Sequence, residues 1–368
     1  MSDPIADTNM GARDGAMSLL AQVAVADSLA NRGLATAIDD FFLPEPARLD
    51  ERSRVALARL LRALIATVEG EIRGHAVRLL RAQDLGELAE ALHGAGDAYA
   101  PLSDTGLLRD TELMAELIAR VRQEGLATGM QAHGHAERDR PSLINRFVQH
   151  PDRVLAQGAM AVLIAESRRR SVPDHGPLAQ TDLPAELHHR LVWWVAAALR
   201  ARVVTEGETP AALDRALVEA AQRSLAAHDE GDRLEAASMR LAVAIDARPA
   251  EAAELMAEAL ADRRVTLFAA LLAHALGVDY AAARDIALDA PDGRLWVALR
   301  ALNFPREAVA HIGVALAEAD PRLDIEAFAD QLDEIMAIEA EEARDALATL
   351  RLPADYRAAM LALKGERR

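Results

Sequence analysis

Two histidines close together in the sequence are the first residues that could do chemistry. His133 and His135 are separated by one glycine, and Glu137 and Asp139 follow shortly after them. Imidazole nitrogens together with a carboxylate are ligands that zinc accepts. Residues i and i+2 face different ways on a helix, so these side chains could converge only in a loop. A solvated turn is the favoured interpretation, and no metal site is predicted.

The densest basic spot is the run of Arg168, Arg169 and Arg170. Arginines near the carboxyl end of a helix complement the helix dipole, which is the purely structural interpretation. The functional interpretation is a docking site for a phosphate group or an acidic partner. As a docking site, the run predicts that reversal of all three charges abolishes partner binding and leaves thermal stability nearly unchanged.

Two adjacent tryptophans, Trp193 and Trp194, point in directions about 100° apart if they lie on a helix. The apolar neighbours Leu191, Val192 and Val195 favour burial of both indoles in a core. An exposed indole would instead be a binding anchor, because tryptophan is enriched at interface hot spots. Trp193 and Trp194 therefore join the three arginines as the candidate binding residues.

Three other groups are predicted to be structural. Trp296 is expected in the core, and His188 and His189, on the same helix as the two tryptophans, are expected to be boundary residues rather than ligands. Four acidic residues on one late helix are expected to form a solvated face, because their spacing lacks the alternating pattern of a calcium loop. These four are Glu339, Glu341, Glu342 and Asp345.

The sequence contains none of the common catalytic signatures. It has no Walker-type glycine-rich loop, no dinucleotide fingerprint, no nucleophile elbow and no His-Glu-x-x-His motif. The absence of cysteine excludes disulfides, a thiolate nucleophile and cysteine-ligated zinc. The single lysine, Lys364, lies in a charged terminal segment and is a poor candidate for a catalytic amine. We therefore expect a protein that is not an enzyme, with no catalytic residues and no cofactor.

Helices must position the candidate residues, because composition and periodicity both predict an all-α protein. Hydrophobic residues make up 51% of the chain but aromatic residues only 3%, so the core must consist of Ala, Leu, Val and Ile. Alanine and leucine favour helices, and residues that favour strands are scarce. Apolar stripes with a period of 3.6 residues fall in the ranges 57–68, 267–276, 309–316 and 325–335. Gly277 is expected to end the second of these helices.

Prolines and glycines indicate where helices begin and end. Proline in the first turn costs no hydrogen bond, and seven prolines stand just before apolar segments: Pro141, Pro151, Pro184, Pro210, Pro249, Pro305 and Pro353. The stretch Gly94–Gly106 is expected to be a loop, because its 97–104 portion has few apolar residues. Residues 171–183, which contain Pro173, Gly176 and Pro177, are expected to be a linker.

These prolines and glycines divide the chain into four expected parts. Residues 1–14 are expected to be a disordered tail, 15–170 a HEAT-like helical domain, 171–183 a linker and 184–368 a second helical domain. Short helices with one apolar stripe cannot bury it alone, and stacking them into a solenoid-like array solves the problem. An irregular helical repeat is therefore expected, with a compact bundle in each half as the alternative.

Several segments resemble the packing motifs of a known family. The segment Arg48–Leu80, with LIATVEGEIRGHAVRLL, resembles a HEAT-like helix pair, and five further segments look similar: Pro101–Ile118, Leu143–Glu166, Leu183–Arg200, Ala259–Val278 and Arg294–Ile312. Together they resemble the bacterial family called domain of unknown function 2336, found chiefly in alphaproteobacteria, from about residue 30 onward. The resemblance implies a HEAT-like helical fold, and the family offers no catalytic residues to carry over.

The charge of the chain limits its expected partners. Asp plus Glu number 58 against 41 Lys plus Arg, which gives a net charge of −17. Such a surface repels nucleic-acid phosphates and anionic lipids. Residues 1–10 lack the basic-then-apolar order of a signal peptide, and the longest apolar run, 191–199, is too short to span a bilayer. We expect a cytoplasmic protein whose partner is another protein, with no nucleic acid and no membrane; a homo-oligomer is left open.

The function predicted from these features is a non-catalytic helical scaffold or adaptor that mediates protein–protein interaction. Resemblance to other bacterial helical adaptors implies a context in bacterial signalling. One alternative is a small-ligand or nucleotide sensor with an arginine-lined pocket between the two halves. The other is a HEAT-like enzyme of the DNA-repair type, which the acidic charge disfavours and a basic concave face would favour.

Overall fold

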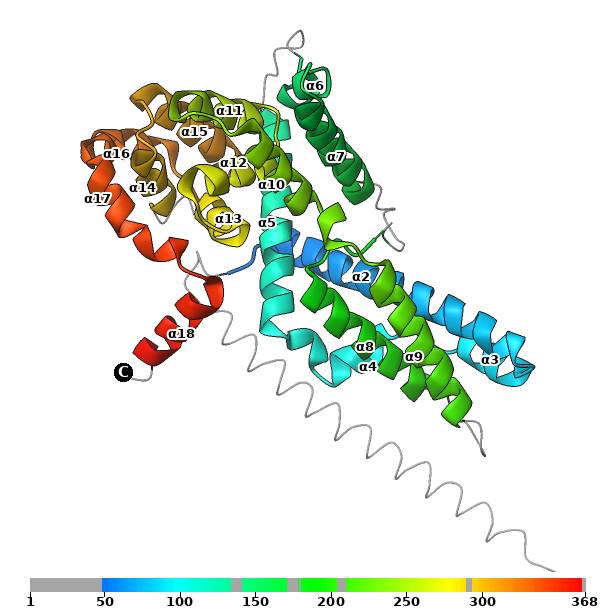
Figure 1. The fold of residues 1–368 in the computed structure, drawn as a ribbon. Coiled ribbons are helices and arrows are strands. Elements are labelled where there is room, and N and C mark those ends of the chain that lie inside the picture. Colours follow the sequence, from blue (N-terminus) through cyan, green and yellow to red (C-terminus); the bar gives the residue numbers. More distant parts are fainter. Residues whose placement is uncertain are drawn as a thin grey trace, which may run out of the picture. The chain divides into compact units, whose positions relative to one another are not determined.

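The computed structural model describes residues 48–133, 141–170, 178, 180–203, 210–288 and 293–365. Residues Arg52–Arg368 form one compact unit, distinct from Met1–Glu51. The described residues form α-helices and short 3-10 turns and contain no strand, so the chain is all-α as predicted (Figure 1). The tail expected at residues 1–14 lies outside the described residues.

Of the described helices, α2 and α5 are the longest. The first half contains α2 (Glu51–Ala82), α3 (Gly86–His93), α4 (Tyr99–Asp104), α5 (Thr111–His133), α6 (Leu143–Val148) and α7 (Arg153–Arg170). Next come α8 (Ala185–Arg202), α9 (Pro210–Ala227), α10 (Leu234–Ile245), α11 (Pro249–Ala261), α12 (Val265–Leu276) and α13 (Tyr280–Leu288). The last are α14 (Arg294–Ala301), α15 (Arg306–Ala319), α16 (Ile325–Ala337), α17 (Ala340–Ala346) and α18 (Ala354–Gly365).

The predicted boundaries agree with these elements. Each of the seven prolines lies at or within two residues of a helix start; Pro210 and Pro249, for example, are the first residues of α9 and α11. Gly277 ends α12 with a φ of +66°, a left-handed conformation that glycine adopts without steric cost. Most residues of the four predicted apolar stripes are buried on α2, α12, α15 and α16, and the others are half-buried or exposed. Ile325, the first residue of α16, is 46% exposed.

The prediction of a loop at residues 97–104 was wrong, because α4 forms there. The Asp97 carboxylate accepts the Ala100 N–H at 3.1 Å, which satisfies a free donor at the start of the helix. The Glu69 carboxylate of α2 accepts the Ala98 N–H at 2.9 Å, and Leu102 is buried. Contacts with residues distant in the sequence therefore stabilise a helix that is too short and too polar to predict from its own residues.

One group of helices packs around α8. This helix packs on α9 and α4. The Ser224 hydroxyl of α9 donates to Glu71 of α2 at 2.8 Å. At the carboxyl end of α3, the Arg73 guanidinium of α2 donates to the carbonyls of Leu92, His93, Ala95 and Gly96 at 2.6–3.1 Å. Because these carbonyls lie at the last turn of α3 and just beyond it, the arginine joins α2 to the end of that helix.

A large apolar core surrounds α12, whose residues are buried on nearly every side. It packs against α10, α11, α13 and α5. Trp296 of α14 is buried as predicted and lies 4.7 Å from the ring of Phe328 in α16. Of the described helices, none has alone both the length and the apolar composition to cross a bilayer; α12 and α13, bent by 119°, meet those criteria only as a pair.

The contacts cross the expected boundary at residues 171–183. Helix α7 packs on α10, and α5 packs on α12, α13 and α15 (Figure 1). Gly129 of α5 permits one of these contacts, because a Cβ there would lie 2.5 Å from the Ala319 carbonyl oxygen of α15. Residues from both predicted halves therefore lie in one compact unit. The all-α architecture is established, whereas a regular HEAT-like repeat is not.

Candidate functional site

The three candidate arginines at the end of α7 have different environments. The Arg168 side chain is 40% exposed and pairs with Asp232 at 2.8 Å. Arg169 is buried and contacts two carboxylates. The side chain of Arg170 lies outside the described residues. In contrast to the sequence-based expectation, reversal of all three charges is now expected to lower stability, because at Arg169 it would place a carboxylate beside Asp182 and Glu235.

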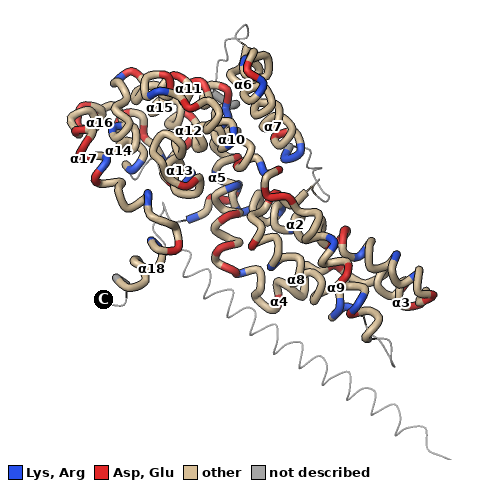
Figure 2. Tube along the Cα trace, viewed as in Figure 1, with Lys and Arg blue, Asp and Glu red and all other residues tan. Residues whose placement is uncertain are grey.

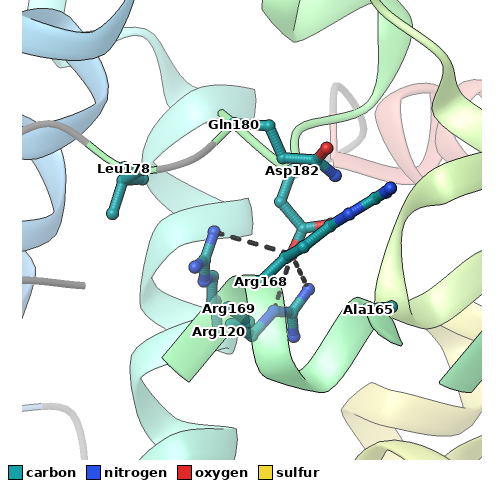
Figure 3. A pocket seen from close by; sticks show the side chains of 7 residues that line it. All are labelled: Arg120, Ala165, Arg168, Arg169, Leu178, Gln180 and Asp182. Atoms are coloured by element: carbon teal, nitrogen blue, oxygen red, sulfur yellow. Dashed lines mark hydrogen bonds and ion pairs between the residues drawn. The ribbon is translucent and has the colours of Figure 1, made fainter. Parts of the chain in front are cut away.

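Arg169 is the centre of a buried group of charges. Its Nε donates to Asp182 Oδ2 at 2.6 Å, and its Nη2 lies 2.7 and 2.8 Å from the two oxygens of Glu235 in α10. Arg120 of α5 approaches the same Asp182 oxygen at 3.9 Å (Figure 3). The group therefore joins α5, α7, α10 and the segment that precedes α8.

The charges continue from Glu235 into α13. The Arg233 guanidinium lies 3.6 Å from Glu235 and donates to Glu116 of α5 at 3.0 Å. The other oxygen of Glu116 accepts from Arg284 of α13 at 2.7 Å. We call the seven residues Glu116, Arg120, Arg169, Asp182, Arg233, Glu235 and Arg284 the arginine–carboxylate network. Because positive and negative groups alternate in it, each buried charge has an opposite neighbour, which is the condition for keeping ions in a protein interior.

The network keeps Glu235 and Arg169 in their charged forms. Burial by itself raises the pKa of the Glu235 carboxyl, but the charges of Arg169 and Arg233 and the hydrogen bond from Arg169 outweigh burial and lower this pKa to about 2. Burial opposes the charge of Arg169 as well, yet Glu235 and Asp182 raise its pKa above the usual value. At neutral pH, neither group can exchange a proton with a substrate, so the network is suited to structure and anion contact rather than to acid–base chemistry.

A small pocket lies beside the network at the carboxyl end of α7. It is lined by Arg120, Ala165, Arg168, Arg169, Leu178, Gln180 and Asp182 (Figure 3). Asp182 has a φ of +55°, a left-handed conformation that costs energy for a residue other than glycine. Its carboxylate is the anion that the arginines hold, so the pocket is arginine-lined but its cations are already paired.

The described part of the predicted linker is buried rather than exposed. Leu178, Thr181, Asp182 and Leu183 are all buried. The Leu178 N–H donates to Thr67 Oγ1 of α2 at 2.7 Å. A domain linker usually runs over the surface and makes few contacts, whereas this segment connects helices on both sides of it.

Two stacked histidines hold the same segment. The rings of His188 and His228 lie 4.0 Å apart and 14° from parallel. His188 Nδ1 lies 2.9 Å from Thr181 Oγ1, and His228 Nε2 lies 3.0 Å from the Leu183 carbonyl. Burial lowers the pKa of His188 to about 4, and the electrostatic influence of His228 and His189 acts in the same direction. His188 is therefore neutral over the physiological range and part of the packing.

The two tryptophans of α8 are half-buried, so the expectation that both lie in the core was not met. The Trp193 indole donates to His189 Nε2 at 3.1 Å, one turn earlier on the same helix. Leu191, Val192 and Val195 occupy the buried side. Both tryptophans thus keep part of their surface accessible.

Three exposed apolar residues lie on α7. Val154 is 64% exposed, Met160 44% and Ile164 46%. Steps of three or four residues lead from Val154 through Gln157 to Met160, Ile164 and Arg168, so these residues share one side of the helix. We call Arg153, Val154, Gln157, Met160, Ile164 and Arg168 the α7 face. The opposite side of α7, which includes Ala159 and Val162, packs into the core.

The sequence held only a partial signal for these features. Helix α7 has apolar residues around most of its circumference. A helix that packs on the core with one side needs apolar residues on that side only, so the others indicate a second apolar side. Arg120 lies four residues after Glu116 and four residues before Glu124, a spacing that predicts ion pairs along one helix. The pair of Arg120 with Glu124 is present. The contacts of Asp182, Arg233, Glu235 and Arg284 with distant residues left no local pattern.

The remaining candidates have simple outcomes. The four acidic residues of α17 and the position before it are exposed, as predicted. The possible metal ligands between His133 and Asp139 lie outside the residues whose side chains are described. In the part of the chain that the structure describes, no three histidine, aspartate or glutamate side chains form a group that could hold a metal ion.

Comparison with known proteins identifies a family. A family model described as an uncharacterised protein conserved in bacteria, domain of unknown function 2336, matches residues 134–349. This is more than half of the chain, and it includes α7, Asp182 and Glu235, although it begins well after residue 30, where the resemblance was expected to begin. No curated protein and no solved structure matches the chain significantly. The chain therefore belongs to the bacterial family called domain of unknown function 2336.

Proposed function

We propose that this chain is a non-catalytic helical scaffold that binds another protein through the α7 face. The observation that carries the proposal is that Val154, Met160 and Ile164 expose large apolar side chains on one side of a helix whose other side is packed in the core. Neighbouring exposed apolar residues, bordered by polar ones, are typical of protein interaction sites. A single exposed apolar residue would carry no such meaning.

The ion pairs that hold α7 in place suit it to this role. Its carboxyl end is fixed by the contacts of Arg169 with Asp182 and Glu235, and Glu166 pairs with Arg264, the residue before α12. A rigid surface loses little conformational entropy when a partner binds. The arginine–carboxylate network supports the proposal in this way, by positioning α7 and not by contacting the partner.

The test compares two isoleucines that are equally exposed. Ile164 lies on the α7 face and Ile325 at the start of α16, and each is 46% exposed. Affinity capture from bacterial cells is done with the wild type, Ile164→Glu and Ile325→Glu, and the recovered proteins are quantified by mass spectrometry. The proposal expects a protein that the wild type and Ile325→Glu recover equally and Ile164→Glu loses. Recovery of the same proteins by all three, or of none by the wild type, contradicts it.

A second candidate is a sensor for a small anion, and the arginine-lined pocket favours it. Calorimetric titration of the full chain with inorganic phosphate and with ATP tests it, with Arg120→Met as the comparison. A sensor predicts binding by the wild type and its loss in the variant. We rank it second because Arg168 and Arg169 are already paired with carboxylates, which an anion would have to displace.

No observation favours the DNA-repair alternative. Figure 2 shows basic and acidic residues interspersed along the described helices. An enzyme that acts on DNA needs a basic surface for the phosphate backbone. The cytoplasmic location and the signalling context remain predictions from the sequence.

A further inference from the structure

The α7 face combines apolar side chains with positive ends, which is unusual for this chain. Helix α7 contains four arginines and one glutamate, whereas the chain as a whole has a net charge of −17. The glutamate, Glu166, is turned toward Arg264 in the core. Arg153 is exposed at one end of the α7 face, and Arg168 is half-exposed at the other. The α7 face itself therefore has no carboxylate.

From this pattern we infer that the partner is an acidic amphipathic helix of another protein, about four turns long, which lies along α7. The inference rests on the proposed function and adds the chemistry of the partner to it. The length follows from the distance between the two arginines, because fifteen residues of α-helix at 1.5 Å per residue extend about 22 Å. An apolar stripe on the partner would cover Val154, Met160 and Ile164, and a carboxylate at each end would meet an arginine.

Arg168 can take such a carboxylate although it already has a partner. Its bond with Asp232 joins two side chains that are 40% and 52% exposed, and ion pairs so accessible to water hold together weakly. A carboxylate from a partner helix would share or replace Asp232 at little cost. Arg169 is not available in this way, because its two carboxylates are buried with it.

The charges argue against a second copy of this chain as the occupant. An antiparallel pair of α7 helices centred near Met160 would bring Arg153 of each copy against Arg168 of the other. Both ends of such an interface would then place like charges together, which is unfavourable. An acidic partner would instead bring opposite charges together at both ends of α7. The acidic remainder of the chain repels such a partner, which favours its binding at the α7 face.

The experiment selects peptides on the full chain. The probe is a display library of 18-residue helical peptides with a fixed leucine stripe, in which the polar positions vary among Glu, Lys and Gln. We expect selection on the wild type to enrich Glu over Lys at least tenfold. The Kd of the best acidic peptide, measured by fluorescence anisotropy, should rise at least tenfold in Ile164→Glu and in Arg168→Glu and stay within twofold in Ile325→Glu. Selection on Arg168→Glu should shift the enriched pool toward Lys.

Several outcomes would overturn the inference. They are a pool with no preference for Glu, a pool rich in Lys, a peptide that binds all variants equally, and no enrichment at all. Sedimentation with anionic phosphatidylglycerol vesicles covers the other acidic surface that α7 could meet: binding that Ile164→Glu abolishes would assign the face to a membrane instead. Circular dichroism melts of each variant confirm that it is folded, which we expect because the substituted side chains are exposed.

The two proposals can fail separately. Lys-rich peptides that need Ile164 would refute the acidic partner and leave the α7 face as a protein-binding surface. A captured partner that is insensitive to Ile164→Glu would refute the proposed function itself. Thus the selection decides the chemistry of the partner, and the capture decides whether α7 binds a protein.

Discussion

Replacement of Arg169 by methionine tests the difference between two adjacent arginines. The change removes a buried guanidinium and leaves Asp182 and Glu235 with weaker partners, Arg120 at 3.9 Å and Arg233 at 3.6 Å. Loss of one member of a buried ion pair costs about 3–5 kcal/mol of unfolding free energy. The Arg168→Met control breaks an exposed pair with Asp232, which is worth about 0–1 kcal/mol.

These free energies convert into melting temperatures. The compact unit Arg52–Arg368 has about 320 residues, so its unfolding entropy is about 0.7 kcal/mol/K near 60 °C. Arg169→Met should therefore lower the melting temperature by about 4–7 °C, and Arg168→Met by about 1.5 °C at most. Differential scanning calorimetry at pH 7 measures both. Equal drops for the two variants, or a drop below 2 °C for Arg169→Met, would refute the account of the arginine–carboxylate network.

Three further predictions concern pH and packing. Because the pKa of His188 is lowered from 6.5 to about 4, the unfolded chain takes up its proton first, and stability should fall as pH drops from about 6.5 to about 4; chemical denaturation should show a flatter profile over this window in His188→Gln. The pKa of Glu235 is lowered from 4.5 to about 2, so the stabilisation by its charged form is present above about pH 4.5 and should be lost as pH falls from there toward 2. The Glu235→Gln variant should lack this part of the pH dependence of the unfolding free energy. Gly313→Ala should lower the unfolding free energy by about 1–3 kcal/mol, because a Cβ there would lie 2.1 Å from the Phe328 ring. In the control Gly70→Ala in α2, the Cβ meets nothing within 4 Å, and the variant should be more stable by about 0.5–1 kcal/mol. Urea unfolding measures both, and equal effects would show that the packing is not as described.

The parts of the fold that depend on local sequence were predictable. An apolar residue every three or four positions marks the buried side of α12 and α15 from their own residues alone. Proline and Gly277 mark the helix ends for equally local reasons, since each constrains the backbone at its own position. Burial of Trp296 followed from its neighbours in the same helix.

The parts that depend on distant residues were not predictable. Glu235 lies 66 residues from Arg169, and the sequence around either residue does not predict that they pair. The prolines and polar residues of 171–183 predict a linker, yet Asp182 and Thr181 are buried because arginines and a histidine from separate helices contact them there. Likewise, α4 exists because Glu69 of α2 binds its first turn.

The candidate site shows the same division. The sequence identified the carboxyl end of α7 as the region of interest, but it could not separate the half-exposed Arg168 from the buried Arg169. That separation depends on the direction of α7 relative to α10, which only tertiary packing determines. The exposed Met160 and Ile164 were missed for the same reason, since an apolar residue on a helix is more often core than surface.

Photo-crosslinking inside bacterial cells tests the central claim most directly. A benzophenone amino acid replaces Met160 on the α7 face in one strain and Ile325 on α16 in another, and crosslinked products are identified by mass spectrometry after irradiation. The account predicts a specific adduct to a different protein from position 160 and none from position 325. An adduct from position 325 alone, or no adduct from position 160, would contradict the claim that α7 is the surface through which this protein binds a partner.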